Sequence, residues 1–165
     1  MDLFGDALMR YLASIVNHRQ DAEDLFQGTW VRVAERIDRF DPERPFGPWL
    51  FRLARNAAYD HLRRRRWLRP FESRRRGEAG QPPAEEQRPD TRDLGQKIIS
   101  RDLTARLLAG LDSDQREVVH LRFWAELSYE EIAELCAVPI GTVKSRLSRA
   151  LARLGELNAQ LESGR

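Results

Sequence analysis

Apolar residues recur every three or four positions along most of the chain, the spacing of one buried face of an α-helix. Three such stretches lie in the first part of the sequence, at 3–17, at 21–37 and from Pro48 onward. A break is expected at 41–45, because Asp-Pro-Glu-Arg-Pro places two prolines where a helix needs backbone N–H groups. No convincing stretch alternates with a period of two, so the pattern predicts an all-α protein.

The C-terminal part shows the same spacing in four shorter segments. Leucines at 103–111 mark the first, and apolar residues at 118–124 mark the second. The sequence Ser-Tyr-Glu-Glu at 128–131 has the form of a capping box and predicts a short helix that ends near Cys136. Pro139 begins the last helix. Two short helices joined by a tight turn predict a helix-turn-helix.

The segment between these two parts has a different composition. Residues 74–97 hold three prolines, several glycines and charged residues, and no aromatic residue. Such a segment buries too little apolar surface to offset the entropy lost on ordering its backbone. We therefore expect a flexible linker at 71–100 between a three-helix domain at 1–70 and a four-helix domain at 101–160.

Several classes of protein are excluded by composition. The single cysteine, Cys136, cannot form an internal disulfide and is expected to fill the core, and the three histidines are not spaced as metal ligands. We expect neither a metal nor a cofactor. No apolar run approaches the roughly 20 residues that cross a bilayer, and the N-terminus is not a secretory signal. The expectation is a cytoplasmic protein without membrane insertion.

Positive charge is concentrated in two blocks, although the net charge is only +2. Residues 61–80 contain eight arginines and two glutamates, and residues 142–165 contain five basic and two acidic side chains. Two separate basic blocks suit a polyanion that is contacted at two places, although solvated helix faces remain the alternative.

The exposed side of the last helix has an unusual composition. From Thr142 to Gly155 it contains no carboxylate, whereas an ordinary solvated face would include glutamate. Short hydroxyls and long cations are the groups that read a DNA major groove and its phosphates. The residues on this side are Lys144, Ser145, Arg146, Ser148, Arg149 and Arg153.

Two further helix faces carry candidate binding residues. In the helix from Pro48, cations and aromatic rings are interleaved on the side opposite the apolar residues. This pattern favours binding of single-stranded nucleic acid. The alternative is that Trp49 and Tyr59 pack on neighbouring helices. Behind the apolar side of 21–37 an exposed valine lies near a glycine, which favours docking of another helix. The first face contains Trp49, Arg52, Arg55, Asn56, Tyr59, Arg63 and Arg66, and the second contains Asp24, Gln27, Gly28, Val31 and Glu35.

These motifs resemble a known family. Asp-Ala-Glu-Asp-Leu-Phe-Gln at 21–27, Arg-Phe-Asp-Pro at 39–42, Pro-Trp-Leu-Phe-Arg-Leu-Ala-Arg-Asn at 48–56 and Asp-His-Leu-Arg-Arg at 60–64 resemble region 2 of bacterial sigma factors. Leu-Ser-Tyr-Glu-Glu-Ile-Ala at 127–133 and Pro-Ile-Gly-Thr-Val-Lys-Ser-Arg-Leu at 139–147 resemble region 4. With only these two regions, the chain is similar to the extracytoplasmic-function group. One departure is Ala137, which stands where the family usually has glycine and costs about 1 kcal/mol if its φ is positive.

The resemblance implies a promoter-specificity subunit that binds the β′ and β subunits of core RNA polymerase and promoter DNA. An anti-sigma protein is a further candidate partner, because many family members are restrained by one. Together with the helix faces, the resemblance assigns polymerase docking to Asp24, Gln27, Val31 and Arg32. It assigns recognition and opening of the minus-ten element to the turn 41–47 and to Trp49, Arg52, Asn56, Tyr59, Asp60 and Arg63. Contacts to the minus-thirty-five element fall on Thr142, Lys144, Ser145, Arg146, Ser148 and Arg149.

Two other functions are compatible with parts of the sequence. A nuclease or deaminase would need converging carboxylates or a metal site, and no cluster with suitable spacing appears, so we expect no enzymatic activity. A conventional operator-binding regulator would use only the C-terminal helix-turn-helix and would bind its DNA without polymerase. Residues 1–70 would then bind a ligand or dimerise.

Overall fold

The structure is a computed structural model that describes residues 4–16, 18–72 and 103–163, and each element of regular structure in these ranges is a helix. In the N-terminal half, α1 (Gly5–Val16) is followed by α2 (Arg19–Arg36), the 3-10 turn η1 (Ile37–Arg39) and α3 (Phe46–Glu72). The all-α prediction is confirmed. Residues 73–100 of the expected linker lie outside the described residues.

The C-terminal half contains a helical stretch at 103–109, followed by α5 (Ser113–Phe123), α6 (Tyr129–Cys136) and α7 (Ile140–Ser163). The predicted capping box opens α6: the Glu131 N–H donates to Ser128 Oγ at 3.1 Å, and the Ser128 N–H donates to Glu131 Oε2 at 2.7 Å. A second capping box, formed by Asp112 and Gln115, opens α5. Each box satisfies N–H groups that the first turn of a helix leaves without an intrahelical partner.

The turn between α6 and α7 begins at Ala137, which has a φ of 56° and a ψ of 46°. A residue in this left-handed conformation ends a helix and redirects the chain, and glycine adopts it at least cost. The positive φ considered from the sequence is thus present, and this alanine carries a strain of about 1 kcal/mol. Cys136 is buried beside it, as expected for a core residue.

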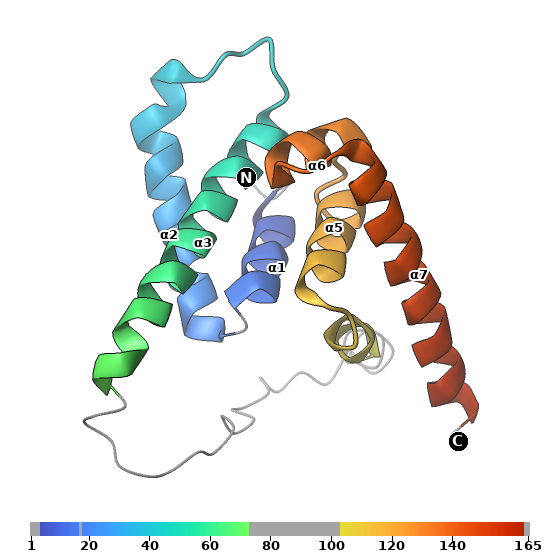
Figure 1. Cartoon of the computed structure of the whole chain (residues 1–165). Coiled ribbons are helices and arrows are strands. Elements are labelled where there is room, and N and C mark those ends of the chain that lie inside the picture. The colour runs from blue at the N-terminus through green and yellow to red at the C-terminus, as the bar shows by residue number, and fades with distance from the viewer. Residues whose placement is uncertain (1–3, 17, 73–102, 164–165) are drawn as a thin grey trace, which may run out of the picture.

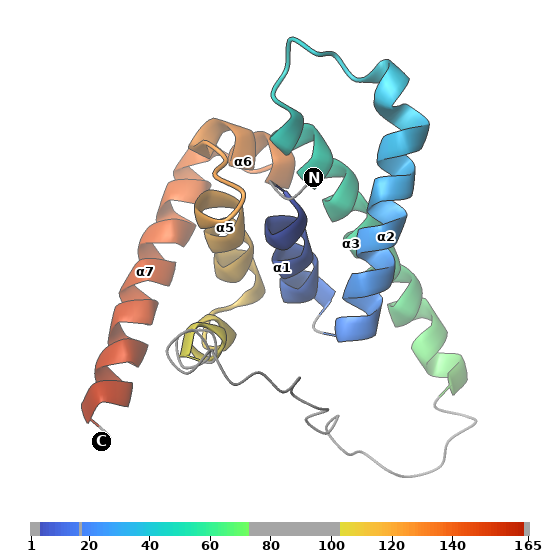
Figure 2. The same ribbon diagram turned by 180° about the vertical axis from the view of Figure 1, so that it is seen from behind.

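The two halves pack against each other along α1. This helix contacts α2 and α3 on one side and α5 on the other, and α3 also contacts α6 (Figure 1 and, from behind, Figure 2). Tyr11 of α1 is fully buried and meets the ring of Phe51 edge to face at 5.3 Å between centroids. A single cluster of buried residues therefore extends from the N-terminal half into the C-terminal half.

The buried His120 of α5 makes stability sensitive to acid. Burial, with added repulsion from Arg116 and Arg10, lowers the pKa of His120 from 6.5 to about 4. Between these two values the unfolded state binds more protons than the folded state, so the free energy of unfolding falls as the pH falls from 6.5 towards 4. The ring also lies against Trp124, at 4.7 Å between centroids.

Acidification should lower the free energy of unfolding of the wild type by up to about 3 kcal/mol more than that of His120→Phe, which cannot take up this proton. The substitution keeps a ring against Trp124. Urea unfolding at pH 7 and at pH 4.5 measures this difference. Parallel losses in the two proteins would show that another group causes the acid sensitivity.

Candidate nucleic-acid interfaces

The C-terminal candidate face lies on α7, whose opposite side fills the core. Val143, Leu147 and Ala150 are buried, which turns the residues between them outward. Of the candidate residues, Lys144, Ser145, Ser148 and Arg149 are exposed, and Thr142 and Arg146 are half-buried. The predicted basic and hydroxyl surface is therefore available to a ligand at four of its six positions.

Hydrogen bonds within α7 position two side chains of this surface, those of Ser145 and Arg149. Ser145 Oγ donates to the carbonyl of Thr142 at 3.0 Å, and Arg149 Nε donates to the carbonyl of Ser145 at 3.3 Å. Arg153 forms an ion pair with Glu156 at 3.0 Å, one turn further along the helix. Arg149 thus lies against its own helix without a carboxylate partner among the described residues.

Arg146 differs from its neighbours because it pairs with Asp114 in the first turn of α5. Its side chain is only 20% exposed. The sequence pattern alone placed Arg146 on the DNA-reading face, whereas the structure gives it an intramolecular partner that joins the start of α5 to α7. A phosphate could reach this guanidinium only by competing with Asp114.

On α3, the residues assigned to single-stranded DNA divide into two groups. Asn56, Asp60 and Arg63 form the first group; Asn56 and Arg63 are exposed, and Arg63 Nη2 pairs with Asp60 Oδ1 at 2.5 Å. None of these three side chains forms a hydrogen bond or an ion pair with a described residue of the C-terminal half, so this part of the face is open to a strand.

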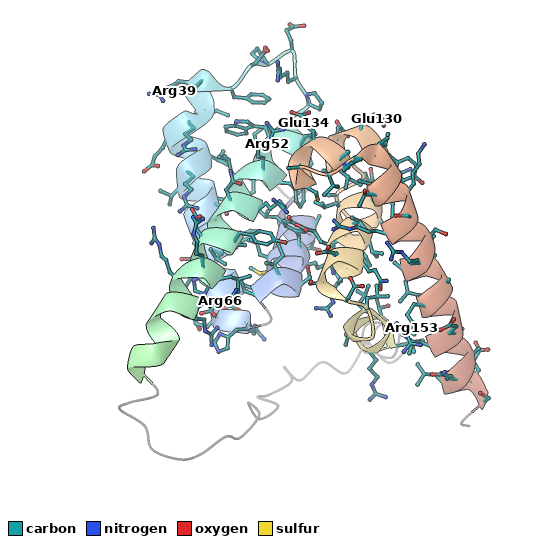
Figure 3. All side chains as sticks on the ribbon, viewed as in Figure 1. Arg39, Arg52, Arg66, Glu130, Glu134 and Arg153 are labelled. Atoms are coloured by element: carbon teal, nitrogen blue, oxygen red, sulfur yellow. The ribbon has the colours of Figure 1, made fainter. Side chains whose placement is uncertain are left out.

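The second group, Arg52, Arg55 and Tyr59, is engaged by carboxylates of the C-terminal half. Arg55 Nε and Tyr59 Oη donate to Glu117 at 2.9 and 3.1 Å, and Arg52 Nη2 donates to Glu134 at 2.6 Å. Arg52 and Glu134 lie side by side where α3 meets α6 (Figure 3). Burial, reinforced by the negative charge of Glu117, raises the pKa of Tyr59 to about 12, so this hydroxyl remains a donor.

The aromatic residue at the start of α3 packs within its own half. Trp49 is half-buried, and its ring lies 4.9 Å from that of Phe40 and 5.5 Å from that of Phe46. These two rings belong to the segment that precedes α3 and to the first turn of α3, so the contacts of Trp49 with them are not the packing on neighbouring helices named as the alternative. Part of the ring remains accessible beside the turn 41–47.

That turn borders a cleft of about 590 Å³ between α3 and α6. Asp41 shapes the turn, because its side chain accepts from the N–H of Glu43 and its carbonyl accepts from the N–H of Arg44. Three arginines and Asp41 line the N-terminal side of the cleft, and Glu131 and Glu134 line the α6 side. The lining residues are Arg39, Phe40, Asp41, Arg44, Pro45, Pro48, Trp49, Arg52, Glu131 and Glu134.

The candidate protein-docking face on α2 is exposed. Asp24, Gln27 and Val31 face solvent, Val31 with 57% of its surface accessible, and Arg32 is half-buried. A side chain added at Gly28 would meet no atom within 4 Å. An exposed valine with free space beside it is consistent with a helix docking here.

Neither a metal cluster nor a membrane-spanning helix occurs among the described residues. The thiol of Cys136 lies near the Glu117 cluster, and burial followed by the charge of Glu117 raises its pKa to about 12. A thiol that holds its proton so firmly is a poor nucleophile and metal ligand. Its role is packing, as the sequence indicated.

Known families match both halves of the chain. Residues 2–68 match the family model described as Sigma-70 region 2, and residues 101–154 match that described as Sigma-70, region 4. The chain is 35% identical to RNA polymerase sigma factor CarQ of Myxococcus xanthus, over 98% of this chain and 90% of CarQ. It is 32% identical to the ECF RNA polymerase sigma factor RpoE of Cereibacter sphaeroides, over 92% of this chain and 80% of that protein.

A solved structure shares the fold. It is the sigma factor RpoE from Bartonella quintana in complex with the anti-sigma factor NepR, which superposes with a TM-score of 0.70 at 31% identity. The similarity covers 95% of this chain and 92% of that one. The likeness therefore includes both halves and not the helix-turn-helix alone.

Proposed function

We propose that three helix faces of this chain have separate roles in promoter recognition. The chain belongs to the extracytoplasmic-function group of RNA polymerase sigma factors. The chain binds core RNA polymerase and directs transcription initiation. Polymerase docking falls on α2, recognition and opening of the minus-ten element on α3, and contact with the minus-thirty-five element on α7. The domains that carry these roles are 1–70 and 101–160, joined by the linker 71–100.

The observation that carries this proposal is the composition of the exposed side of α7. Lys144, Ser145, Ser148 and Arg149 lie outward over buried aliphatic residues, with no carboxylate from Thr142 to Gly155. A recognition helix in the major groove requires such a side. On this proposal the protein acts by binding rather than by catalysis.

The operator-binding alternative is not favoured. It uses only the helix-turn-helix and gives no role to the match of residues 2–68 to Sigma-70 region 2 or to the exposed cations of α3. Binding to promoter DNA is therefore proposed to depend on polymerase.

We also propose that an anti-sigma protein restrains this chain in the cytoplasm. The support is the solved relative from Bartonella quintana, which is itself in complex with an anti-sigma factor. The similarity to that relative covers 95% of the present chain. The β′ subunit is the proposed partner of α2, and β is the proposed second contact of the polymerase.

The docking role of α2 is tested by Gln27→Lys. We expect this change to weaken binding to core polymerase by about tenfold or more, because a charge placed at the centre of a docking face must be desolvated. Thermal stability should not change, since Gln27 is exposed. Pull-down with core polymerase and a thermal melt measure the two effects.

The matched control is Gln160→Lys on the exposed side of α7. It makes the same chemical change outside the docking face and should leave polymerase binding intact. Normal binding by Gln27→Lys, together with a normal melt, would remove α2 from the proposal.

A further inference from the structure

A second cavity of about 590 Å³ is lined by residues of α1, of the helical stretch 103–109 and of α5. The stretch 103–109 lies at the end of the molecule where α5 begins (Figure 1). Cavities that hold small molecules in proteins usually have a volume of this order. None of the residues that line this cavity is among those assigned to polymerase or to DNA, so it needs an explanation of its own.

The spacing of the residues in the helices brings the polar side chains of this cavity together. Residues four positions apart lie on the same side of a helix. Arg116, His120 and Trp124 follow this spacing along α5, and Arg10 and Ser14 follow it along α1. The cavity lies between these two rows, and no carboxylate occurs among the described residues that line it.

Two arginines give the cavity its positive charge. Arg116 is held by backbone carbonyls, because Nε donates to Leu108 at 3.0 Å and Nη2 donates to Leu111 at 2.8 Å. Nη1 donates to the carbonyl of Ser14 at 3.4 Å. These neutral acceptors fix the guanidinium and leave its charge uncompensated. Arg10 has no carboxylate partner among the described residues, and both arginines are half-buried. Hollow surfaces lined by charges of one sign attract ions of the opposite sign.

His120 is a separate indication that a polar group binds here. The residue is only 5% exposed, and its Nδ1 has no hydrogen-bond partner in the part of the chain that the structure describes. Buried polar atoms rarely stay without a partner. Because burial and the repulsion from Arg116 and Arg10 lower the pKa of His120 to about 4, the ring is neutral at pH 7. A polar group bound in the cavity beside this ring would complete its hydrogen bonding.

The rest of the cavity wall is apolar, and much of it is made of small side chains. Trp124 and Leu108 are half-buried on this wall. The other apolar positions are Ala13, Ala105 and Ala109, which are exposed, so the cavity opens to solvent. A larger side chain at these positions would fill part of the space. The wall therefore offers cations to one end of a ligand and an aromatic and aliphatic surface to the other.

We propose that this cavity binds a small organic anion, with its carboxylate or phosphate group between Arg10 and Arg116 and its apolar body against Trp124. Guanidinium groups form strong, charge-assisted hydrogen bonds with both kinds of anion. The carbonyls that hold Arg116 orient one cation before the ligand arrives, which lowers the entropy that binding must offset. Arg10 adds the second cation from the facing helix.

Isothermal titration calorimetry on the full chain tests the site with four probes. Benzoate and phenyl phosphate each join a ring to one of the two anionic groups, inorganic phosphate lacks the ring, and benzyl alcohol lacks the charge. We expect at least one of the two ring-bearing anions to bind with a Kd of about 1 mM or below, at least about tenfold more tightly than inorganic phosphate or benzyl alcohol. The tighter of the two identifies the anionic group. Absence of saturable binding by both, or equal binding of inorganic phosphate, would overturn the proposal.

Arg10→Gln removes one cation and keeps a polar side chain, and should weaken binding of the tighter probe by about tenfold. Arg10 is preferred to Arg116 for this test because Arg116 also holds three carbonyls. The matched control is Arg36→Gln, which removes the same charge from an exposed position of α2 that does not line the cavity. Equal losses in the two variants would show attraction by net charge alone and would overturn the proposal.

Ala105→Phe supplies a second variant that changes no charge. The position is exposed on the stretch 103–109, so the thermal melt should not change, but the new ring fills the cavity and should abolish binding. Undiminished binding by this variant would mean that the probe lies elsewhere.

Nuclear magnetic resonance of the ¹⁵N-labelled chain locates the bound probe. The indole N–H signal of Trp124, assigned with Trp124→Phe, should shift as the probe is added, whereas those of Trp30 and Trp49 should not. Shifts confined to the other tryptophans would overturn the proposal. None of these measurements involves polymerase or DNA, so their outcome does not depend on the proposed function.

Discussion

Replacing Asn56 and Arg63 together with alanine is expected to lower open-complex formation by about a hundredfold, because each lost polar or charged contact to the displaced strand is worth about 1–2 kcal/mol. Both side chains are exposed on α3, and among the described residues Arg63 pairs only with Asp60 of its own helix. The fold should therefore be unaffected, and assembly with polymerase nearly intact. Permanganate footprinting on a natural promoter measures the opened bases.

The neighbouring arginine supplies the control for this prediction. Arg64 is exposed one residue further along α3, about 100° around the helix from Arg63. Its replacement by alanine should reduce opening much less. On a template whose bubble is already melted, the double variant should recover; an undiminished defect there would assign these residues to a step other than opening.

Arg149→Ala is expected to reduce the differences in binding free energy among upstream promoter variants by about 1–3 kcal/mol. This is the discrimination that a good contact to a base edge supplies. Arg149 is exposed beside Ser145 and Ser148 and has no carboxylate partner among the described residues. Arg153 lies one turn further on and pairs with Glu156. Arg153→Ala should weaken binding to all variants alike and lower the salt dependence, as loss of a phosphate contact does.

The measurement is binding of holoenzyme to a panel of upstream-element variants at two salt concentrations. The two substitutions remove the same side chain from the same helix, so each is the control for the other. The placement of α7 in the groove would be contradicted if Arg149→Ala kept the order of affinities among the promoter variants while Arg153→Ala changed it.

Local chemistry allowed much of the fold to be predicted. The capping box at Ser128 and the break at 41–45 depend on residues close in sequence, and both appear in the structure. Ala137 lies in the turn between the two helices, and its positive φ meets the condition that the sequence analysis set for its strain. Such features need no knowledge of how distant segments pack.

The contact between the two halves could not be predicted in this way. Glu117 and Arg55 are 62 positions apart, and neither helix alone shows that they meet. One signal was available: Glu117 directly precedes the apolar pair Val118 and Val119, and all three are buried. A carboxylate on the buried side of a helix needs a cation or donor from elsewhere, but helical periodicity does not identify that partner.

The same reason explains the partners of Arg52 and Arg146. Helical periodicity places each of them on an outward face, and the structure pairs them with Glu134 and Asp114. Whether an outward cation is free or paired depends on a neighbouring helix. Assignments to DNA made from one helix at a time are therefore strongest for Asn56, Arg63 and Arg149.

Run-off transcription from genomic fragments, with bacterial core polymerase in the presence and absence of this protein, is the decisive test of its role as a sigma factor. We expect transcripts from discrete start sites that appear only when the protein is added, and their loss with the Asn56 and Arg63 double variant. Tight, sequence-specific binding to such fragments by the protein alone, with no added transcript from core polymerase, would contradict it.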